Sequence, residues 1–344
     1  MALQIVDAMN NAGAWNALAP NGATPSTEIS ATDETNQVRY GADAHSLRVA
    51  ASGDAQDHLL RRTRAALDLS AFGELRLWIF SSRIADGSAS QPFFLELRLG
   101  SAALALDAPG NTWHRYLSVA RAGTWELIRL SLADLAPAVR SSLSTLQLRC
   151  IDAAMPFTCV LDDLAAVRDE MLADADAALL ARLHERITLN GTAVPALLYV
   201  PGVAAPSQPY IRITQHHIAF ADERTSSSRA RTDFSSNRFA LRPPSYGYNL
   251  YYQFEAVAAN RSEQATLLEF ILRELTPRGE LIVNNSPLPL EWVPVPPYNA
   301  DGAPLTDRAL LYFRVLTYQE VGAAEPAVPP YHSVSIEIDQ AQPA

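Results

Sequence analysis

The sequence lacks the features that would point to a membrane, a secretory pathway or a nucleic acid. No apolar run approaches the roughly 20 residues that a membrane-spanning helix needs. The start, Met1 to Asp7, lacks the basic and then apolar layout of a signal peptide. The net charge is −10, whereas a general nucleic-acid binder carries the opposite sign. We therefore expect a protein made in a cytoplasm, with neither a membrane nor a specific nucleic acid among its partners.

Motifs for catalysis are missing as well. The chain contains no Gly-x-Ser-x-Gly, no His-Glu-x-x-His and no glycine-rich phosphate loop. Asp162 and Asp163 are adjacent on an expected strand and would face apart, which disfavours a glycosidase pair. His216 and His217 are also adjacent on an expected strand, so a shared metal is disfavoured. The sequence predicts a protein that is not an enzyme.

Cysteine is scarce, with only Cys150 and Cys159. They flank an expected loop between two strands, and antiparallel neighbours would bring them within bonding range. The alternative is a pair of buried free thiols, which is favoured because disulfides are rare in a cytoplasm. Two cysteines without paired histidines do not support a zinc site.

The length of 344 residues exceeds the size at which one core usually keeps growing, so two domains are expected. Val38–Val167 is a series of short strands separated by turn signals, typical of a β-sandwich or jelly roll. Within it, Leu75, Leu77 and Ile79 alternate with Glu74, Arg76 and Trp78. We expect domains at 1–168 and 187–344, joined by a linker helix over 169–186, where leucine and alanine recur at helical spacing.

The first domain resembles the jelly rolls of carbohydrate-binding modules and galactose-binding-like proteins. The resemblance rests on the opening strand Tyr40–Val49, the Leu-Asp-Leu-Ser element that begins Leu67–Trp78, the strand Trp125–Leu135, and the closing Leu-Asp-Asp strand Leu161–Val167. It implies a β-sandwich. It is weaker evidence for sugar binding, because this fold hosts many functions.

The same resemblance implies candidate ligand sites. Sugars in that family stack on exposed aromatic rings, and the candidates here are Trp78, Trp113 and Tyr116. The alternative for these rings is packing inside the sandwich. A structural calcium is also frequent in the family, and carboxylate oxygens are the ligands that calcium prefers. Candidate ligands are Asp33, Glu34, Asp162 and Asp163, although Asp162 alternatively caps a strand end.

The second half is organised around Arg238–Val295. Tyr248, Leu250, Tyr252, Phe254 and Ala256 alternate with other residues, which predicts a half-buried strand. A helix is expected over Ser262–Leu275, with Ser262 as its cap. Its buried stripe would comprise Ala265, Leu268, Ile271, Leu272 and Leu275.

Further strands and loops complete this half. A hairpin on a type I′ turn is expected at Asn190-Gly191. Strands are expected at Ala309–Val315 and, as an added edge, at Ser333–Ile338. Asp222–Asn237 is rich in serine and arginine, which predicts an exposed, mobile loop or an arm ordered by a partner.

Residues 187–318 resemble tail-terminator-like and related neck or tail proteins of bacteriophages and contractile injection systems. The shared pattern is a proline-bounded tyrosine-rich strand, a polar turn, a leucine-rich helix and a return strand, here Arg242–Ala256, Ser262–Leu275 and Glu280–Asn284. It implies an α+β assembly domain in a homo-oligomeric ring, a hexamer by resemblance. Candidate assembly residues are Tyr248, Tyr251, Glu269 and Arg273.

Together these features predict a mainly β protein with an α+β part, a jelly roll followed by a tail-terminator-like domain. The leading interpretation is a structural protein of a bacteriophage virion, in a tail, neck or collar ring, with an outward-facing jelly roll. Its partners would be other virion tail and neck proteins, together with a host glycan. The alternative is a non-enzymatic glycan-binding module. No cofactor is expected apart from the candidate calcium.

Overall fold

The computed structural model describes residues 3–39, 45–168, 170–221, 230–235, 238–242, 245–294 and 310–319. The chain folds into two compact units. Among the described residues, the first unit comprises 7–164 and 230–242, and we call it the sandwich unit. The second comprises 3–6, 165–221, 245–294 and 310–319, and we call it the α+β unit. The expected fold class, mainly β with an α+β part, is confirmed.

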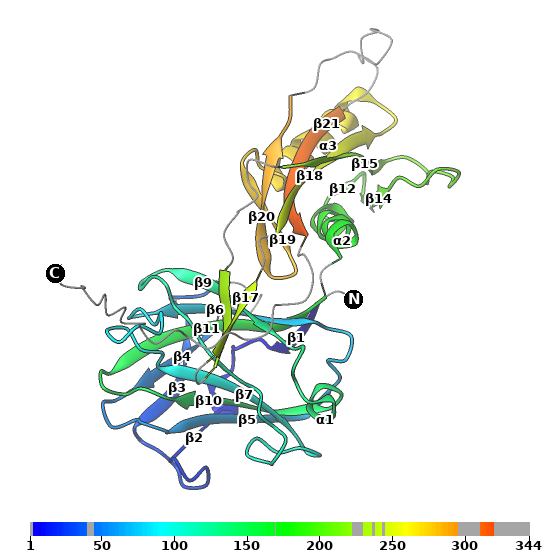
Figure 1. Ribbon diagram of the computed structural model, residues 1–344. Coiled ribbons are helices and arrows are strands. Elements are labelled where there is room, and N and C mark those ends of the chain that lie inside the picture. Colours follow the sequence, from blue (N-terminus) through cyan, green and yellow to red (C-terminus); the bar gives the residue numbers. More distant parts are fainter. Residues whose placement is uncertain are drawn as a thin grey trace, which may run out of the picture. The chain divides into compact units, whose positions relative to one another are not determined.

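The sandwich unit consists of two β-sheets in two layers (Figure 1). One sheet has the order β3-β4-β11-β6-β9, with β1 also paired to β11, and the other has the order β2-β5-β10-β7-β8. The strands are β1 (Leu3–Asp7), β2 (Asn16–Leu18), β3 (Ile29–Glu34), β4 (Ser46–Ala51), β5 (Leu59–Leu67), β6 (Glu74–Ser81), β7 (Leu95–Ser101), β8 (His114–Tyr116), β9 (Trp125–Ser131), β10 (Leu143–Cys150) and β11 (Phe157–Val167). The short helices are η1 (Ala12–Ala14) and α1 (Pro137–Arg140).

The core of this unit lies between the layers, where alternate side chains of each strand meet. Leu75, Leu77 and Ile79 of β6 are fully buried, as their period of two predicts. Leu146 and Leu148 of β10 are fully buried as well. Residues 103–106, after β7, belong to no strand, and the amide of Ser101 donates a 2.9 Å hydrogen bond to the carbonyl of Leu104.

Both cysteines are buried free thiols. Cys150 ends β10 in one sheet, whereas Cys159 lies in β11 of the other sheet. Burial raises the pKa of the Cys150 thiol to about 11. Burial also raises the pKa of Cys159. Both thiols are therefore protonated near neutral pH and unreactive, in agreement with the free-thiol alternative.

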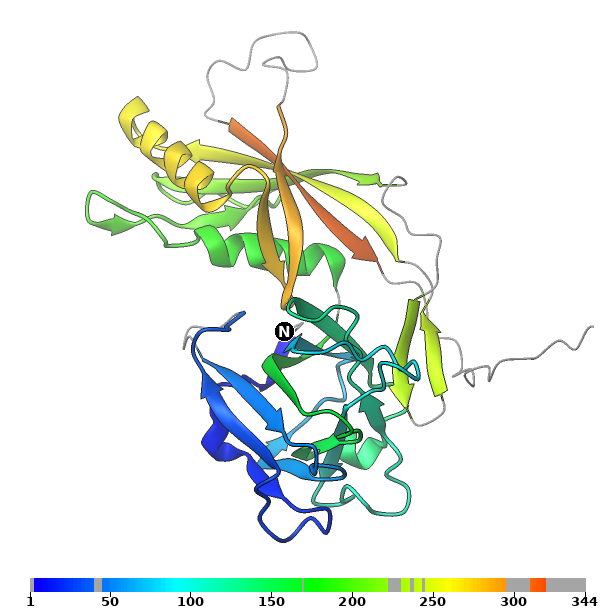
Figure 2. The ribbon, with the colours of Figure 1, turned by 90° about the vertical axis from the view of Figure 1, so that its left-hand side faces the viewer.

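The α+β unit contains one six-stranded sheet with the order β14-β15-β18-β21-β20-β19. Its elements are α2 (Met171–Leu183), β12 (Thr188–Leu189), β13 (Thr192–Ala193), β14 (Ala196–Leu198), β15 (Tyr210–Phe220), β18 (Tyr246–Val257), α3 (Arg261–Glu274), β19 (Gly279–Val283), β20 (Ser286–Trp292) and β21 (Leu310–Gln319). Both helices share one core with Leu250, Tyr252 and Phe254 of β18, so they cover the same face of the sheet (Figure 2). The expected linker helix belongs to this core, through Ala175, Leu179 and Leu183.

Helix α3 differs from the expected helix in its cap and in its buried face. Asn260, rather than Ser262, is the N-cap, and its side chain accepts a 3.0 Å hydrogen bond from the amide of Glu263. The buried residues are Leu267, Phe270, Ile271 and Leu275. Leu272 is 36% exposed, so the expected stripe was wrong at this position. Ala265 is exposed as well, and the buried stripe runs through Leu267 and Phe270 instead.

The hairpin β12–β13 is confirmed, and its turn residues Asn190 and Gly191 have φ angles of 50° and 79°. Two positive φ angles are the signature of a type I′ turn. No helix in the described ranges is long and apolar enough to cross a membrane. The expected edge strand Ser333–Ile338 lies outside the described residues.

Candidate functional site

A β-hairpin from the second half of the sequence belongs to the sandwich unit. It consists of β16 (Ala230–Ser235) and β17 (Arg238–Arg242), and β16 lies against β8 and β9. The hairpin is the separate two-stranded ribbon in yellow-green in Figure 2. Because β8 ends one sheet and β9 ends the other, it covers neighbouring edges of both layers. The prediction of a mobile loop was therefore wrong for 230–235, which are ordered by the chain's own sandwich.

Asp233 is the polar anchor of the hairpin. Its carboxylate Oδ1 accepts a 2.5 Å hydrogen bond from the amide of Ser131 in β9 and lies 3.4 Å from Nε of Arg115 in β8. The side chains of Asp233 and Arg115 are 5% and 7% exposed, so this ion pair is buried. Arg115 also donates to Asp134 at 2.5 Å, but Asp134 is 63% exposed. Asp233 therefore links the hairpin to β8 through Arg115 and to β9 through Ser131. Removing Asp233 would leave the buried charge of Arg115 without this partner, which is costly.

A second ion pair and an aromatic contact reinforce this docking. Arg242 of β17 lies 2.6 Å from Oε2 of Glu74 at the start of β6. Burial raises the pKa of Glu74, but Arg242 and Arg76 outweigh it and hold that pKa below its ordinary value. The ring of Phe234 contacts the ring of Phe93 with centroids 5.0 Å apart. Polar and apolar contacts therefore both hold the hairpin.

The hairpin creates a groove of about 220 Å³. One wall is formed by Tyr116, Ser118 and residues 126–130 of β9, and the other by residues 231–234 of β16. Arg231 is exposed, and its guanidinium lies 5.0 Å from the centre of the Phe239 ring. Glu126 receives hydrogen bonds from the amide of Ala120 and from Arg121. The groove combines an aromatic ring with charged groups, a composition that suits a small polar ligand.

Two of the three candidate stacking rings are buried. Trp78 is 5% exposed and lies under the guanidinium of Arg39, 4.7 Å from the ring centre. Trp113 is 3% exposed and donates a 3.1 Å hydrogen bond to the carbonyl of Ser131. Neither ring presents a face to solvent, in agreement with the packed alternative. Tyr116 is half-buried, contacts Phe93 and lines the groove, so it is the candidate whose position suits ligand contact.

The candidate calcium ligands lie on β3 and β11, which both flank β4. Asp162 is fully buried, and its Oδ2 accepts hydrogen bonds from the amide of Arg39 at 2.7 Å and from the Ser46 hydroxyl at 3.0 Å. Glu34 pairs with Arg48 at 3.5 Å, and Asp33 accepts the amide of Ala12. The part of the chain that the structure describes contains no group of three His, Cys, Asp or Glu residues suited to a metal.

Asp163 lies in the same strand, has a φ of 44°, and its pKa is raised to about 6 by burial and by the neighbouring Asp162. Between the ordinary pKa of 3.8 and about 6 the folded protein binds more protons than the unfolded chain, so stability falls as pH rises. We expect Asp163→Asn to raise the free energy of unfolding by about 1–2 kcal/mol at pH 7.5, after discounting for partial exposure, and by nothing near pH 3.5. Asparagine tolerates the left-handed backbone. Urea unfolding at both pH values measures this difference.

Asp68→Asn is the matched control for that variant. Hydrogen bonds from Ser70 lower the pKa of Asp68, so its charged form stabilises the folded protein. We therefore expect Asp68→Asn to lower the free energy of unfolding at pH 7.5 relative to pH 3.5, the opposite of Asp163→Asn. Equal behaviour of the two variants at both pH values would contradict the assignment of a raised pKa to Asp163.

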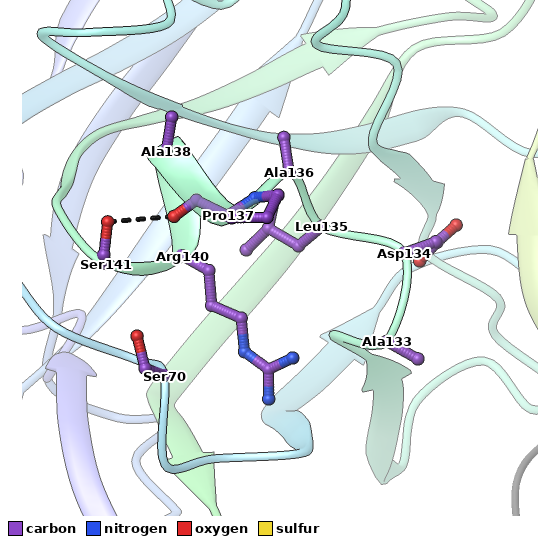
Figure 3. Close-up of a pocket in the computed structure, with 9 residues that line it drawn as sticks. All are labelled: Ser70, Ala133, Asp134, Leu135, Ala136, Pro137, Ala138, Arg140 and Ser141. Atoms are coloured by element: carbon purple, nitrogen blue, oxygen red, sulfur yellow. Dashed lines mark hydrogen bonds between the residues drawn. The ribbon is translucent and has the colours of Figure 1, made fainter.

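A larger hollow of about 660 Å³ surrounds α1 at the surface of the sandwich unit (Figure 3). Its charged side chains already have protein partners. The Arg140 guanidinium donates to the carbonyls of Leu69 and Phe72, and the Ser141 hydroxyl donates to the Pro137 carbonyl at 2.9 Å. Asp134 binds Arg115. Because alanine and proline supply much of the remaining lining, this hollow offers little chemistry for catalysis or ligand recognition.

In the α+β unit, β18 separates two groups of aromatic side chains. Tyr251 points away from the helix-covered core, and its ring lies 6.2 Å from that of His216 and 5.4 Å from that of His217. His216 also contacts Tyr312 edge-on at 5.7 Å. We call these four residues the His–Tyr patch. A β-bulge between Gln215 and His217 brings both histidines to Tyr251, so the prediction that they face apart was wrong.

The other candidate assembly residues are spread over the unit. Tyr248 lies on the opposite face of β18 from Tyr251 and contacts the exposed ring of Phe220 at 5.8 Å. Glu269 and Arg273 are exposed on α3, as expected. The structure therefore does not bring all four candidates into one surface.

Comparison with known proteins gives matches of fold only. No protein-family model and no curated protein matches the chain. The family 11 carbohydrate-binding module of a cellulosomal cellulase of Clostridium thermocellum is 11% identical, covering 49% of this chain and 96% of that one with a TM-score of 0.32. The PVC sheath/tube terminator of an extracellular contractile injection system is 16% identical, covering 51% of this chain and 66% of that one with a TM-score of 0.37. Both resemblances indicated by the sequence recur among these solved structures.

A family 30 carbohydrate-binding module is a further match, 17% identical over 45% of this chain and 82% of that one, with a TM-score of 0.32. At such identities the likeness concerns the fold alone. Function has to be argued from the residues themselves.

Sequence reasoning missed the residues that dock the hairpin, namely Asp233, Arg115, Arg242 and Phe234. A signal was present, because two short segments with strand-like spacing, 230–235 and 238–242, are separated by only two residues. The serine and arginine content of the surrounding segment outweighed that signal. The place where the hairpin docks depends on non-local contacts that periodicity does not report.

Proposed function

We propose that this protein is a structural component of a tail-like particle, in the tail, neck or collar of a bacteriophage virion. The α+β unit would hold identical copies in a ring, six by resemblance to tail terminators. The sandwich unit would face outward. The pattern of strand, polar turn, helix and return strand supports the assignment, and the described residues offer little for catalysis.

The single observation that carries this proposal is the His–Tyr patch. The helices cover one face of the six-stranded sheet, and Tyr251 and Tyr312 lie on the other face with both histidines. Arg314, next to this patch, is held by Glu291 at 2.5 Å. Aromatic rings with few unpaired charges are typical of the centre of a protein interface, where tyrosine is enriched. A neighbouring copy in a closed ring would cover such a face without open-ended growth.

The test is the mass of the purified full-length protein in solution, by light scattering and native mass spectrometry. We expect a single ring-sized species, and we expect Tyr251→Asp to weaken association about 30-fold or more, the loss typical of a central interface residue. Tyr199→Asp is the matched control, because Tyr199 is a 47% exposed tyrosine of the same unit outside the patch. That variant should keep the mass of the unsubstituted protein.

A monomer at high concentration that neither joins purified particles nor competes with the full protein would overturn the assembly role. Glycan binding is the alternative, favoured by the half-buried Tyr116 in the groove beside β16. Oligosaccharide binding by such a monomer would make this alternative the leading function.

A further inference from the structure

The His–Tyr patch places two titratable side chains against one tyrosine ring. In β15, the pairing with β18 passes from Gln215 directly to His217, so His216 is the extra residue of the bulge. Both imidazoles contact the ring of Tyr251, and both are exposed in the single chain. Histidine is the side chain whose ordinary charge change falls between pH 5 and 8. The charge of the patch therefore changes in that range.

The carboxylates of the sheet do not balance this added charge. The six strands contain three of them, Glu255, Glu280 and Glu291. Glu255 is buried and forms an ion pair with Arg212. Glu291 forms an ion pair with Arg314 at 2.5 Å. Glu280 belongs to β19, at the far edge of the sheet from β15. Protonation of the histidines therefore makes this face of the sheet net positive.

We propose that the ring contact opens on acidification, because His216 and His217 gain positive charge on a face that the neighbouring copy covers. This inference rests on the ring proposed above and adds a mode of regulation to it. Neutral imidazoles beside Tyr251 and Tyr312 suit the centre of an interface, where charged side chains are depleted. Two imidazolium groups at the same place do not.

The single chain already disfavours the charged form of one histidine. Partial burial, followed by the neighbouring His217, lowers the pKa of His216 from its ordinary value of 6.5. A neighbouring copy would remove further water from both rings, which acts in the same direction. Attraction between an imidazolium and the Tyr251 ring opposes this effect. That attraction is smaller than the cost of burying an ion without a carboxylate partner, so the repulsive effect dominates.

The direction of the pH dependence follows from proton binding. Separate copies bind protons at the patch as pH falls through about 6.5, whereas covered histidines stay neutral. Acid therefore favours the separate copies. Each histidine that must lose its proton on association lowers the association constant by up to about tenfold between pH 7.5 and pH 5.5. Because the pKa of His216 is already lowered, we expect about 30-fold for the two together.

The test is the association constant of the full-length protein at pH 7.5 and pH 5.5, from sedimentation velocity over a concentration series. We expect a constant about 30-fold lower at pH 5.5, with unchanged far-UV circular dichroism. In His216→Gln with His217→Gln, the ratio between the two pH values should fall to about threefold or less, whatever the absolute constant. In His216→Gln alone, the ratio should be intermediate.

His184→Gln is the matched control. His184 is an exposed histidine of the same unit outside the patch, and its Nδ1 lies 2.8 Å from the carbonyl of Ala196. This variant should keep the full ratio between the two pH values. A ratio reduced as far as in the double variant would show that the response does not come from the patch, and would overturn the proposal.

The remaining outcomes separate this inference from the ring itself. A ring with the same association constant at both pH values would overturn the inference and leave the ring in place. A ring that tightens at pH 5.5 would show that the neighbouring copy presents a carboxylate to the patch, which also overturns it. Dissociation accompanied by a loss of circular dichroism would assign the response to unfolding instead. A monomer at both pH values would overturn the ring and its regulation together.

Discussion

Replacing Asp233 with alanine is expected to lower the free energy of unfolding of the sandwich unit by about 2–4 kcal/mol. The carboxylate is 5% exposed and faces Arg115, which is 7% exposed. Its loss leaves the buried guanidinium with the solvent-exposed Asp134 as its remaining carboxylate among the described residues, and leaves the amide of Ser131 without its 2.5 Å acceptor. Urea unfolding and hydrogen exchange of hairpin amides 231–242 measure the effect. We expect these amides to lose protection before the rest of the unit.

The matched control is Asp134→Ala, which removes the other carboxylate bound to the same Arg115. Because Asp134 is 63% exposed, its ion pair with Arg115 is screened by water, and the expected loss stays below about 1 kcal/mol. An equal loss of unfolding free energy in the two variants would show that the buried Arg115–Asp233 pair stabilises the unit no more than the exposed Arg115–Asp134 pair. Asp233 would then not be the anchor of the hairpin.

The hairpin also bears on how the chain divides. The domain boundary at residue 168 stays a prediction. A fragment of residues 1–168 would lack Asp233, Phe234 and Arg242, and would therefore leave Arg115, Phe93 and Glu74 without these partners. These apolar and charged side chains, which contact the hairpin in the full-length chain, would then be more exposed to water.

Local patterns predicted much of the sandwich because its strands bury one side chain in two. Leu75, Leu77 and Ile79 are apolar in sequence and fully buried in the fold, so periodicity alone identifies the face. The candidate rings Trp78 and Trp113 show the limit of the same method. Both sides of β6 are covered, and periodicity does not report whether the second face of a strand meets solvent or other side chains.

The candidate site was less predictable, because its parts meet through contacts distant in sequence. Asp233 is 118 residues from Arg115 and 102 residues from Ser131, and no local pattern links them. The His–Tyr patch depends on one β-bulge, which reverses the face that simple alternation assigns to a neighbouring histidine. Non-local docking and single-residue bulges are both set by tertiary packing.

The second large expected effect on stability concerns helix α3. The buried face of this helix differs from the one that the sequence predicts. We expect Leu267→Asp to destabilise the α+β unit by about 4 kcal/mol or more. Leu267 is fully buried in the core with Phe270 and Ile271, so the substitution removes apolar contacts and places a carboxylate in the core. Hydrogen exchange of β18, whose Leu250 and Phe254 share this core, measures the loss within this unit.

Leu272→Asp is the matched control on the same helix. Leu272 is 36% exposed, so the expected cost is about 1 kcal/mol or less, including the unfavourable charge near the helix C-terminus. Exposed Glu269 and Arg273 lie beside Leu272 on the solvent side of α3. We therefore expect the amides of β18 to keep their protection from hydrogen exchange in Leu272→Asp. The mass of the same variant in solution tests whether this side of α3 contacts a neighbouring copy. Loss of β18 protection in Leu272→Asp, with protection kept in Leu267→Asp, would restore the stripe expected from the sequence and refute the packing described above.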